Sequence, residues 1–283
     1  MLLFKRVVDL QAYIETQKKA NKTVGLVPTM GALHDGHMTL MESAIEENDL
    51  LVCSIFVNPT QFNEKEDLVK YPRPLEDDIA MLTKVGCHIL FLPEVDEVYP
   101  KGWETPSFDF KNLDKPMEGA FRPGHFNGVA QVIHRLLDIV KPTSLYVGQK
   151  DYQQWAIIQS MLQQLNSTVR LVCCPIARKE NGLAMSSRNM RLSEESIAIA
   201  PNIYKILQEA KQNLIHFSIE EVKEKAIASL NSIPEFQLDY FEIADGNNLE
   251  AITEKGSSGL IVACTAVFLA NVRLIDNLIL KSS

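Results

Sequence analysis

Residues 50–57, with the sequence LLVCSIFV, decide the fold class of this chain. The run is continuously apolar and contains several β-branched side chains, which is typical of a central parallel strand that is covered on both faces. Shorter apolar runs at 24–28, 88–92, 145–147 and 169–174 predict further strands of the same kind. Residues 1–175 therefore contain five predicted buried strands.

Segments whose apolar residues recur at helical spacing separate these predicted strands. Leu40 to Ile45 repeats its apolar residues at that spacing, so a helix is expected to start near His37. Further helices are predicted at 75–85, 129–140 (ended by Pro142) and 155–165. Alternation of strand and helix predicts a Rossmann-like, doubly wound parallel sheet of the α/β class. We expect residues 1–175 to form this domain and to bind the ligand.

The pattern changes after Pro175. Residues 193–213 and 218–230 predict helices, and 238–244 and 259–269 predict strands. Helices followed by strands predict a smaller C-terminal α+β domain, residues 176–283. The longest apolar stretch, 259–272, is about fourteen residues, shorter than the roughly 20 of a membrane span. Two interpretations of it stay open, a core strand and an interface.

Charge and cysteine content exclude several classes. With 28 basic and 36 acidic residues the formal net charge is -8, which disfavours sequence-independent nucleic-acid binding. The N-terminal residues lack a signal-peptide pattern, so we expect a cytoplasmic protein with no membrane partner. The cysteines are odd in number and form no C-x-x-C pair, which predicts reduced thiols and no protein-built metal site: Cys53, Cys87, Cys173, Cys174 and Cys264.

The segment PTMGALHDGH, residues 28–37, runs from the first predicted strand into a helix. Ligands of open α/β sheets bind beyond the carboxyl ends of the strands. His34 and His37 would share one face of the first helical turn, and Gly36 would let an anion approach the backbone. The helix N-terminus would add free N–H groups and partial positive charge. The segment predicts a polyphosphate site; the alternatives are solvated loop histidines or two metal ligands without a third.

Two further polar clusters follow predicted strands. In NPTQF (58–62), the Asn58 and Gln61 amides suit hydroxyl and carboxylate groups of a small substrate, although a plain turn would look the same. In GQKDYQQ (148–154), Lys150 can pair with phosphate. Asp151 can cap the following helix or bind a ribose hydroxyl. A surface Lys-Asp pair at a helix start is common, so this cluster is weak by itself.

The segment MSSRN, residues 185–189, follows the last predicted strand of the first domain. Two hydroxyls and a guanidinium in a row suit a mobile anion clamp. The alternative is a polar loop before a helix capped by Ser193. Arg122 and His125, which lie between the NPTQF and GQKDYQQ segments, are further candidate anion contacts. His88, His134 and His216 are interpreted as structural.

Several common signatures are absent from the sequence. We find no G-x-x-x-x-G-K-[ST], G-x-G-x-x-G, G-x-S-x-G or H-E-x-x-H. ATP, if bound, is therefore not held by a Walker loop, and a nicotinamide cofactor is disfavoured.

The histidine pair and the Ser-Ser-Arg loop together resemble the HIGH and KMSKS motifs of the nucleotidyltransferase superfamily. PTMGALHDGH, FVNPTQF, YPR, FRPGHFNGV, GQKDYQQ, GLAMSSRN and DYFEIAD are similar to segments of the pantoate–β-alanine ligase family, in the same order and at about the same spacing. Asp35, Met38 and Thr39 are conservative departures in the first segment. Ala184 precedes Met185, and the lysine of the general KMSKS motif is absent, as it also is in this family.

The resemblance implies ATP-dependent condensation of pantoate with β-alanine through a pantoyl adenylate, with Mg²⁺ on the phosphates and a homodimer. It also implies that the C-terminal domain, residues 176–283, is a lid that keeps water away from the adenylate. It implies that His34 and His37 are the catalytic residues, with His37 the better candidate for proton donation. Gln61 and Gln154 would bind pantoate, and Gln61 would also lie near β-alanine. The implied ATP-binding residues are Met30, Gly31, Ala32, Leu33, His34, Asp35, Gly36, His37, Gly148, Gln149, Lys150, Asp151, Ala177, Met185, Ser186, Ser187 and Arg188.

Two other functions remain open from the sequence. One is an adenylyltransferase that leaves AMP on its product. The other is a nucleotide-binding sensor without catalysis, which the joint presence of two histidines, a hydroxyl-arginine loop and two glutamines disfavours.

Overall fold

The computed structural model describes residues 1–62 and 65–282, which divide into two compact units. Each unit is assembled from more than one stretch of the chain. The first unit comprises Met1–Phe110, Arg122–Gly148 and Ile157–Pro175. The second comprises Lys111–Phe121, Gln149–Ala156 and the chain from Ile176 onward.

The first unit is built on a parallel sheet. Within the described residues this sheet has six strands in the order β1-β4-β3-β2-β5-β6. Strand β3 (Leu50–Ile55) covers six of the eight residues quoted first, and all six are buried, as a central strand requires. Strand order reverses between β2 and β5, which is where ligands of doubly wound sheets bind. The strands are β1 (Leu2–Phe4), β2 (Val24–Thr29), β3 (Leu50–Ile55), β4 (Ile89–Phe91), β5 (Ser144–Gly148) and β6 (Arg170–Cys174).

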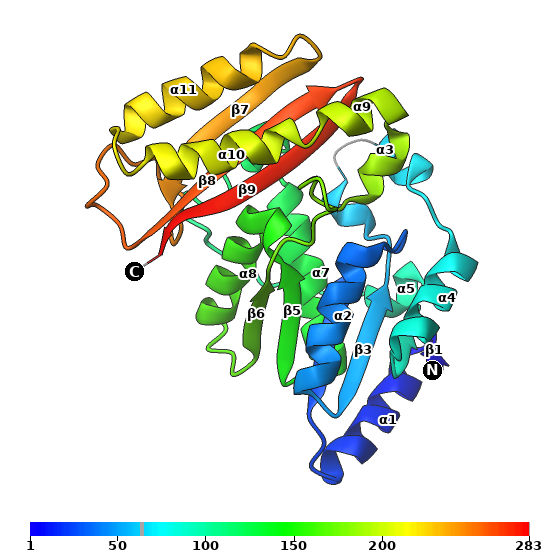
Figure 1. Cartoon of the computed structure of the whole chain (residues 1–283). Coiled ribbons are helices and arrows are strands. Elements are labelled where there is room, and N and C mark those ends of the chain that lie inside the picture. Colours follow the sequence, from blue (N-terminus) through cyan, green and yellow to red (C-terminus); the bar gives the residue numbers. More distant parts are fainter. Residues whose placement is uncertain (63–64, 283) are drawn as a thin grey trace. The chain divides into compact units, whose positions relative to one another are not determined.

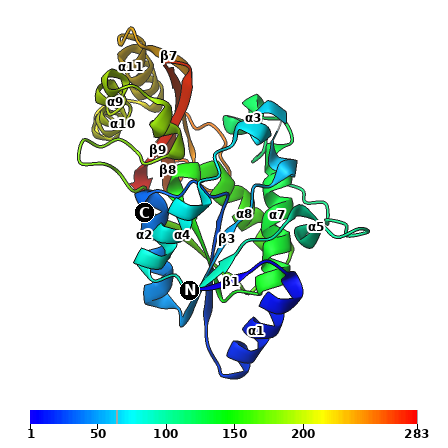
Figure 2. The same cartoon turned by 90° about the vertical axis from the view of Figure 1, so that its right-hand side faces the viewer.

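Helices cover both faces of this sheet, which confirms the predicted doubly wound class. Figures 1 and 2 show α2 and α4 on one face and α1 and α7 on the other. On the first face Leu40, Met41 and Leu82 pack against strand residues such as Leu51. The helices are α1 (Val7–Lys19), α2 (Asp35–Glu47), η1 (Pro59–Gln61), α3 (Lys65–Lys70), α4 (Leu75–Val85), α5 (Val95–Val98), α7 (His125–Val140) and α8 (Tyr152–Gln164), the last of which begins in the second unit.

The second unit has an antiparallel sheet of three strands within the described chain, in the order β7-β8-β9. One face packs on α10 and α11. The apolar stretch 259–272 supplies β8, the central strand, so the core-strand interpretation is the right one. The elements are α6 (Glu118–Phe121), η2 (Gln149–Asp151), η3 (Ser187–Arg191), α9 (Glu194–Ile199), α10 (Asn202–Asn213), α11 (Ile219–Asn231), β7 (Phe236–Asp245), β8 (Leu260–Leu269) and β9 (Val272–Ser282).

Two early segments complete the other face of this small sheet. Gln153 at the start of α8 receives a hydrogen bond from Glu118 N–H and donates to Leu113 O and Pro116 O. Glu118 in turn accepts hydrogen bonds from Arg273 at 2.8 Å and from the Tyr240 hydroxyl at 3.0 Å. The second unit therefore depends on residues far upstream of its sheet.

The structure differs from the predicted elements at several points. The helix predicted over 193–213 is two helices, because Pro201 lacks the N–H that a continuous helix needs and α10 begins after it. Strand β9 and helix α1 are not among the predicted elements. Ser193 caps α9 by accepting a hydrogen bond from Ser196 N–H at 3.2 Å, as expected from the sequence.

All five cysteines are free thiols, and four of them are buried. None of the helices in the described part of the chain has the length and apolar character of a membrane span.

Candidate functional site

The histidine pair caps helix α2 at the end of strand β2. His34 is the N-cap residue in extended conformation, and the helix begins at Asp35, two residues before the predicted start. The Nδ1 atom of His34 accepts a hydrogen bond from Gly36 N–H at 3.1 Å, and Nδ1 of His37 accepts one from His34 N–H at 3.3 Å. The ring centroids are 4.1 Å apart. The two imidazoles therefore lie side by side at the helix start.

This cap determines which nitrogen of each ring carries the proton. A neutral imidazole has one donor and one acceptor nitrogen. Because both Nδ1 atoms are acceptors, both neutral rings carry their proton on Nε2. Each ring thus has an Nε2–H donor in addition to its capping atom.

The cap also corrects one expectation about the helix N-terminus. The sequence predicts free N–H groups there, but Gly36 N–H is bonded to the His34 ring and His37 N–H donates to His34 O at 2.7 Å. An anion would therefore be bound mainly by the imidazole N–H groups of this segment and less by these backbone amides.

The loop before the histidines has an unusual backbone held by a carboxylate that the sequence analysis missed. Gly31 and Ala32 have positive φ angles of 82° and 51°. Asp78, on α4, accepts hydrogen bonds from Ala32 N–H at 3.0 Å and Leu33 N–H at 2.7 Å. Successive N–H groups in this left-handed conformation form a concave anion site, and here the protein's own carboxylate occupies it.

Burial and hydrogen bonding act in opposite directions on Asp78. Its side chain is 1% exposed. Burial raises the pKa of the Asp78 carboxyl above its ordinary value, while the N–H groups of Leu33 and Ala32 oppose that rise. A Cβ at position 31 would lie 2.9 Å from Asp78 Oδ2, so glycine is required there both for its φ angle and for space. The loop and the carboxylate are built around each other.

Asn58, which is predicted as a possible substrate contact, is buried and hydrogen-bonded to protein groups. Its Nδ2 donates to Gln61 Oε1 at 3.1 Å and to Gly128 O at 3.0 Å. Its Oδ1 accepts hydrogen bonds from Thr60 and from the Tyr99 hydroxyl. Both the oxygen and the nitrogen of the Asn58 amide are thus bonded to protein groups. The Tyr99 hydroxyl that donates to this amide is itself buried, which raises the pKa of Tyr99 to about 12. Asn58 therefore positions Gln61.

Gln61 is held from three directions and stays next to the histidine loop. Its Oε1 is fixed by Asn58, and its Nε2 lies 3.0 Å from Met30 Sδ. The His125 ring bonds to Gln61 O at 2.9 Å. A Cβ on Gly128 would come within 2.4 Å of Thr60 O, so a glycine in α7 permits this close packing. The structure brings together Met30 and Gln61, which are both predicted site residues.

In the second unit, η2 presents the Gln149–Asp151 segment directly after β5, which ends at Gly148. Lys150 lies 3.8 Å from the Asp151 carboxylate. The Gln149 side chain donates to Asn277 Oδ1 at 3.1 Å, so this residue, predicted to line the nucleotide, also anchors its segment to β9. Gln154 is half-buried in the first turn of α8.

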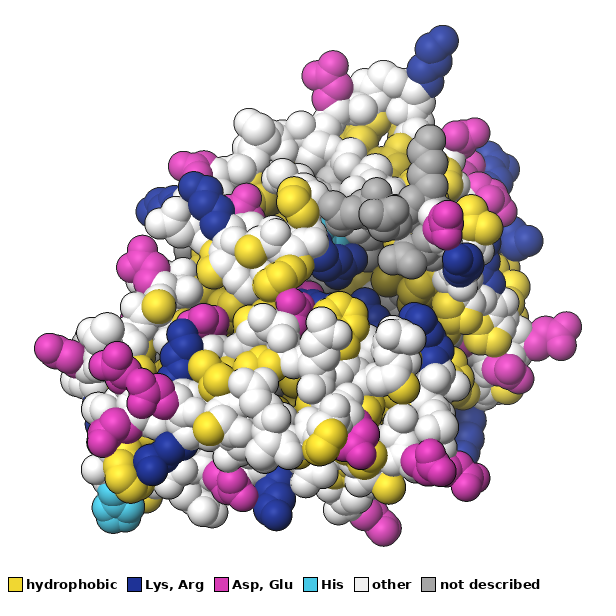
Figure 3. All heavy atoms as spheres, turned by 90° about the horizontal axis from the view of Figure 1, so that it is seen from above, with side chains coloured by type: hydrophobic (Ala, Val, Ile, Leu, Met, Phe, Trp, Pro, Cys, Tyr) yellow, Lys and Arg dark blue, Asp and Glu magenta, His cyan; other side chains and the backbone are white. Residues whose placement is uncertain are grey.

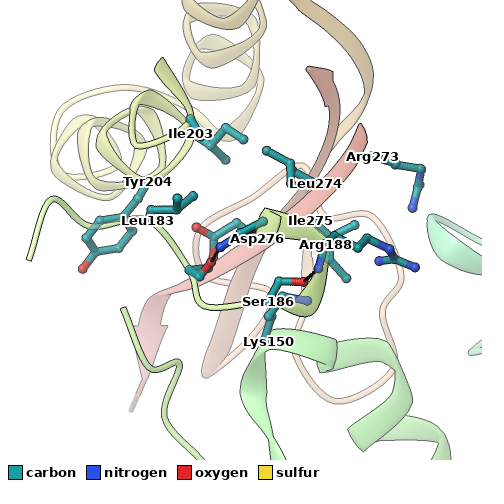
Figure 4. A pocket seen from close by; sticks show the side chains of 13 residues that line it. Lys150, Leu183, Ser186, Arg188, Ile203, Tyr204, Arg273, Leu274, Ile275 and Asp276 are labelled. Atoms are coloured by element: carbon teal, nitrogen blue, oxygen red, sulfur yellow. Dashed lines mark hydrogen bonds between the residues drawn. The ribbon is translucent and has the colours of Figure 1, made fainter. Parts of the chain in front are cut away.

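The Ser-Ser-Arg segment begins η3. Ser186 is the N-cap and its hydroxyl accepts a hydrogen bond from Arg188 N–H at 3.3 Å. Met185 N–H donates to Ala177 O at 2.9 Å, which joins the two arms of the loop. Figure 4 shows Lys150, Ser186 and Arg188 around one pocket. Apolar side chains such as Leu183 and Ile203 line its other side.

The amino-acid sequence matches the family described as pantoate-beta-alanine ligase over residues 2–279. It is 48% identical over 278 residues to the pantothenate synthetase of Porphyromonas gingivalis, covering 98% of this chain and 99% of that protein. It is 45% identical to the pantothenate synthetase of Bacteroides fragilis, and the match covers both chains completely. The chain belongs to the pantoate–β-alanine ligase family.

Solved structures of pantoate–β-alanine ligases have the same fold as this chain. The pantothenate synthetase of Thermus thermophilus superposes with a TM-score of 0.91 at 39% identity, covering 99% of this chain and 100% of that one. The Francisella tularensis enzyme, solved in complex with beta-gamma ATP and β-alanine, gives a TM-score of 0.80 at 33% identity, covering 100% and 99%. These likenesses confirm the expected family and fold.

One face of this pantoate–β-alanine ligase family member carries mixed charge. On the face drawn in Figure 3, lysine and arginine side chains lie among aspartate and glutamate side chains. In the described residues, no cluster of three or more His, Cys, Asp or Glu side chains could hold a metal ion. The chain as a whole is acidic, but the pocket is lined by the cationic side chains of Lys150 and Arg188.

Proposed function

We propose that this chain carries out the reaction after which its family is named, the ATP-dependent condensation of pantoate with β-alanine to pantothenate. The observation that carries the proposal is the match to the family over residues 2–279. The same residues hold a capped histidine pair, a glutamine in contact with Met30, and a lysine-serine-arginine pocket.

The reaction has two steps. A pantoate carboxylate oxygen attacks the α-phosphorus of ATP, the bond from that phosphorus to the bridging oxygen breaks, and pyrophosphate leaves. The amine of β-alanine then attacks the acyl carbon of the pantoyl adenylate, loses a proton and expels AMP. Phosphoryl transfer depends mainly on positioning and charge stabilisation, so no protein nucleophile is needed.

The two histidines would act as neutral donors in the first step. Their Nε2–H groups are the ring donors that take no part in the cap, because the cap uses both Nδ1 atoms. We assign both Nε2–H groups as hydrogen-bond donors to the phosphate oxygens where charge develops, with His37 the better candidate for this donation.

The remaining phosphate and nucleotide contacts follow from the pocket and the loops. Lys150, Ser186, Ser187 and Arg188 would hold the β- and γ-phosphates, since fixed cations and hydroxyls stabilise the leaving pyrophosphate. Asp151 would face the ribose. The other proposed nucleotide contacts are Met30, Gly31, Ala32, Leu33, Asp35, Gly36, Gly148, Gln149, Ala177 and Met185.

Magnesium is proposed as a partner of ATP. The described residues provide no three-residue metal cluster, and Mg²⁺ commonly binds through phosphate oxygens and waters. It would therefore be held by ATP oxygens, where it neutralises phosphate charge. Removal of Mg²⁺ with EDTA should then abolish turnover without changing the thermal stability of the nucleotide-free protein.

Gln61 and Gln154 would orient pantoate, with Gln61 also near β-alanine. The change Gln61→Ala should raise the Kd for pantoate on the order of 10-fold and leave the Kd for ATP within about twofold, because it removes a polar partner of the smaller substrate. Titration calorimetry with each substrate measures both. Equal weakening of ATP and pantoate would show that Gln61 is not a pantoate ligand.

One assay distinguishes the proposed function from its alternatives. The protein is mixed with ATP, Mg²⁺ and pantoate, with and without β-alanine, and pyrophosphate and AMP are followed. The ligase releases free AMP only when β-alanine is present. A stable adenylylated product would indicate an adenylyltransferase. ATP binding without pantoate-dependent exchange of pyrophosphate into ATP would indicate a sensor.

We also propose that the chain forms a homodimer and acts in the cytoplasm. Light scattering coupled to size-exclusion chromatography tests the first, and fractionation of cells that express the protein tests the second. A monomeric mass at micromolar concentration would reject the dimer.

A further inference from the structure

Strand β9 carries two buried polar residues in succession, Asp276 and Asn277, which are 5% and 2% exposed. They pair with Thr265 and Cys264 of the central strand β8. Because adjacent residues of a strand point to opposite faces of its sheet, Asp276 and Asn277 serve different neighbours. Buried polar side chains are almost always hydrogen-bonded, so the partners of Asp276 and Asn277 show which segments these two residues hold in place.

On one face, Asn277 fixes the segment that carries Lys150. Its Nδ2 donates to Gln149 O and to Lys150 O, both at 2.9 Å. Its Oδ1 accepts a hydrogen bond from the Gln149 side chain at 3.1 Å. Three hydrogen bonds from one buried amide therefore determine where the backbone of Lys150 lies.

On the other face, Asp276 fixes the loop that leads to Ser186. Its two carboxylate oxygens accept hydrogen bonds from Arg178 at 2.6 and 2.8 Å. Burial raises the pKa of Asp276 and the facing Arg178 opposes that rise. Arg178 also donates to Gly182 O at 3.1 Å, and its guanidinium lies 3.6 Å from the centre of the Tyr204 ring.

The arms of this loop are closed by an antiparallel bridge between Arg178 and Ala184. Ser186 follows two residues later, and Asn189 donates to Ala184 O at 2.9 Å. The buried ion pair is thus connected by backbone pairing to the Ser186–Arg188 segment. Asp276 itself lies in the lining of the pocket shared by Lys150, Ser186 and Arg188.

We infer that Asp276 and Asn277 are positioning residues that set the separation between Lys150 and the Ser186–Arg188 segment, and so determine which length of phosphate chain the pocket accepts. This inference rests on the proposed function, in which those side chains hold the β- and γ-phosphates. Two cationic segments anchored to successive residues of one strand cannot move independently of each other. A fixed separation selects a ligand whose negative charges match it.

The experiment compares two buried asparagines that differ in what they hold. Asn277→Ala removes the contacts to Gln149 and Lys150. Asn48→Ala is the matched control, because Asn48 is 8% exposed and its Nδ2 likewise makes two hydrogen bonds, to Ala44 O and the Tyr146 hydroxyl. ATP, ADP and AMP are titrated into each variant by calorimetry with Mg²⁺ and without pantoate.

Asn277→Ala should weaken ATP binding on the order of 10-fold and AMP binding by less than about twofold, with ADP between, since displaced phosphate ligands act only on the outer phosphates. Asn48→Ala should leave the three affinities in their original ratio. Equal weakening of all three nucleotides by Asn277→Ala, or an unchanged ATP affinity, overturns the inference.

Lys150→Ala and the double variant with Asn277→Ala separate this inference from the function beneath it. If Lys150→Ala itself fails to discriminate ATP from AMP, the phosphate assignment of the proposed function is wrong. If Lys150→Ala discriminates and Asn277→Ala does not, only the positioning role is wrong. A positioning role acting through Lys150 predicts that the double variant loses less ATP affinity than the two single losses multiplied together.

Arg178→Lys tests the Asp276 side of the inference, because it keeps the positive charge opposite the buried carboxylate and loses the two-pronged contact. It should also weaken ATP binding more than AMP binding, by about fivefold in the ratio of the two Kd values. An unchanged ratio in the folded variant overturns the role of Asp276.

Discussion

His37→Ala should slow formation of the pantoyl adenylate by on the order of 10²–10³-fold, the loss expected when one transition-state donor is removed. The measurement is pantoate-dependent exchange of labelled pyrophosphate into ATP. His37 also accepts the hydrogen bond from His34 N–H, so the same change should cost about 0.5–2 kcal/mol of stability through the lost cap.

Two conservative variants separate the donor from the cap. His37→Asn keeps an acceptor near the position of Nδ1 and lacks Nε2, so it should regain stability and stay inactive. His37→Gln places an amide donor near the position of Nε2 and should recover part of the exchange rate. His216→Ala, an exposed histidine, is the control. A loss below about threefold in folded His37→Ala would show that His37 is no catalytic donor.

Asp78→Ala should lower the free energy of unfolding by about 2–5 kcal/mol, because the buried N–H groups of Ala32 and Leu33 would each lose their acceptor. Since those residues lead directly into His34, exchange activity should also fall on the order of 10²-fold through misplacement of the imidazoles. Chemical denaturation and pyrophosphate exchange measure the two effects on the same samples.

Asp78→Asn keeps one acceptor oxygen in the same place and should lie between the parent and Asp78→Ala in both measurements. Glu76→Gln, an exposed carboxylate in the first turn of the same helix, is the matched control and should change neither. Parental exchange activity in Asp78→Ala, assayed below its melting temperature, would refute the role assigned to the carboxylate.

Strands and helices with strong apolar periodicity were predictable from the sequence. The run at 50–57 became β3, and the helix predicted at 75–85 is α4 with the same limits. Helix α1 was missed because only Leu10 and Ile14 are buried in it. Strand β9 was missed because Asp276 and Asn277 occupy buried positions of its pattern, where their partners come from distant parts of the chain.

The candidate site also contains residues that the sequence predicts and residues that it does not. Residues that offer chemistry, such as His34, His37 and Lys150, stand in segments where glycine and strand ends make them visible in the sequence. Residues that position them do not. Asp78 has the sequence context of an ordinary acidic residue in the first turn of a helix, and Tyr99 is one aromatic residue among several. Their roles arise from contacts across tens of residues, which no local pattern encodes.

The dependence of the small sheet on Gln153 and Glu118 bears on how this protein can be dissected. A fragment expressed from residue 176 would contain Arg273 and Tyr240 without the carboxylate that both of them bind. It would expose the apolar surface that Met117, Tyr152 and Ala156 otherwise cover. Such a truncation should be insoluble or molten, so nucleotide affinities of the C-terminal part are best measured in the intact chain.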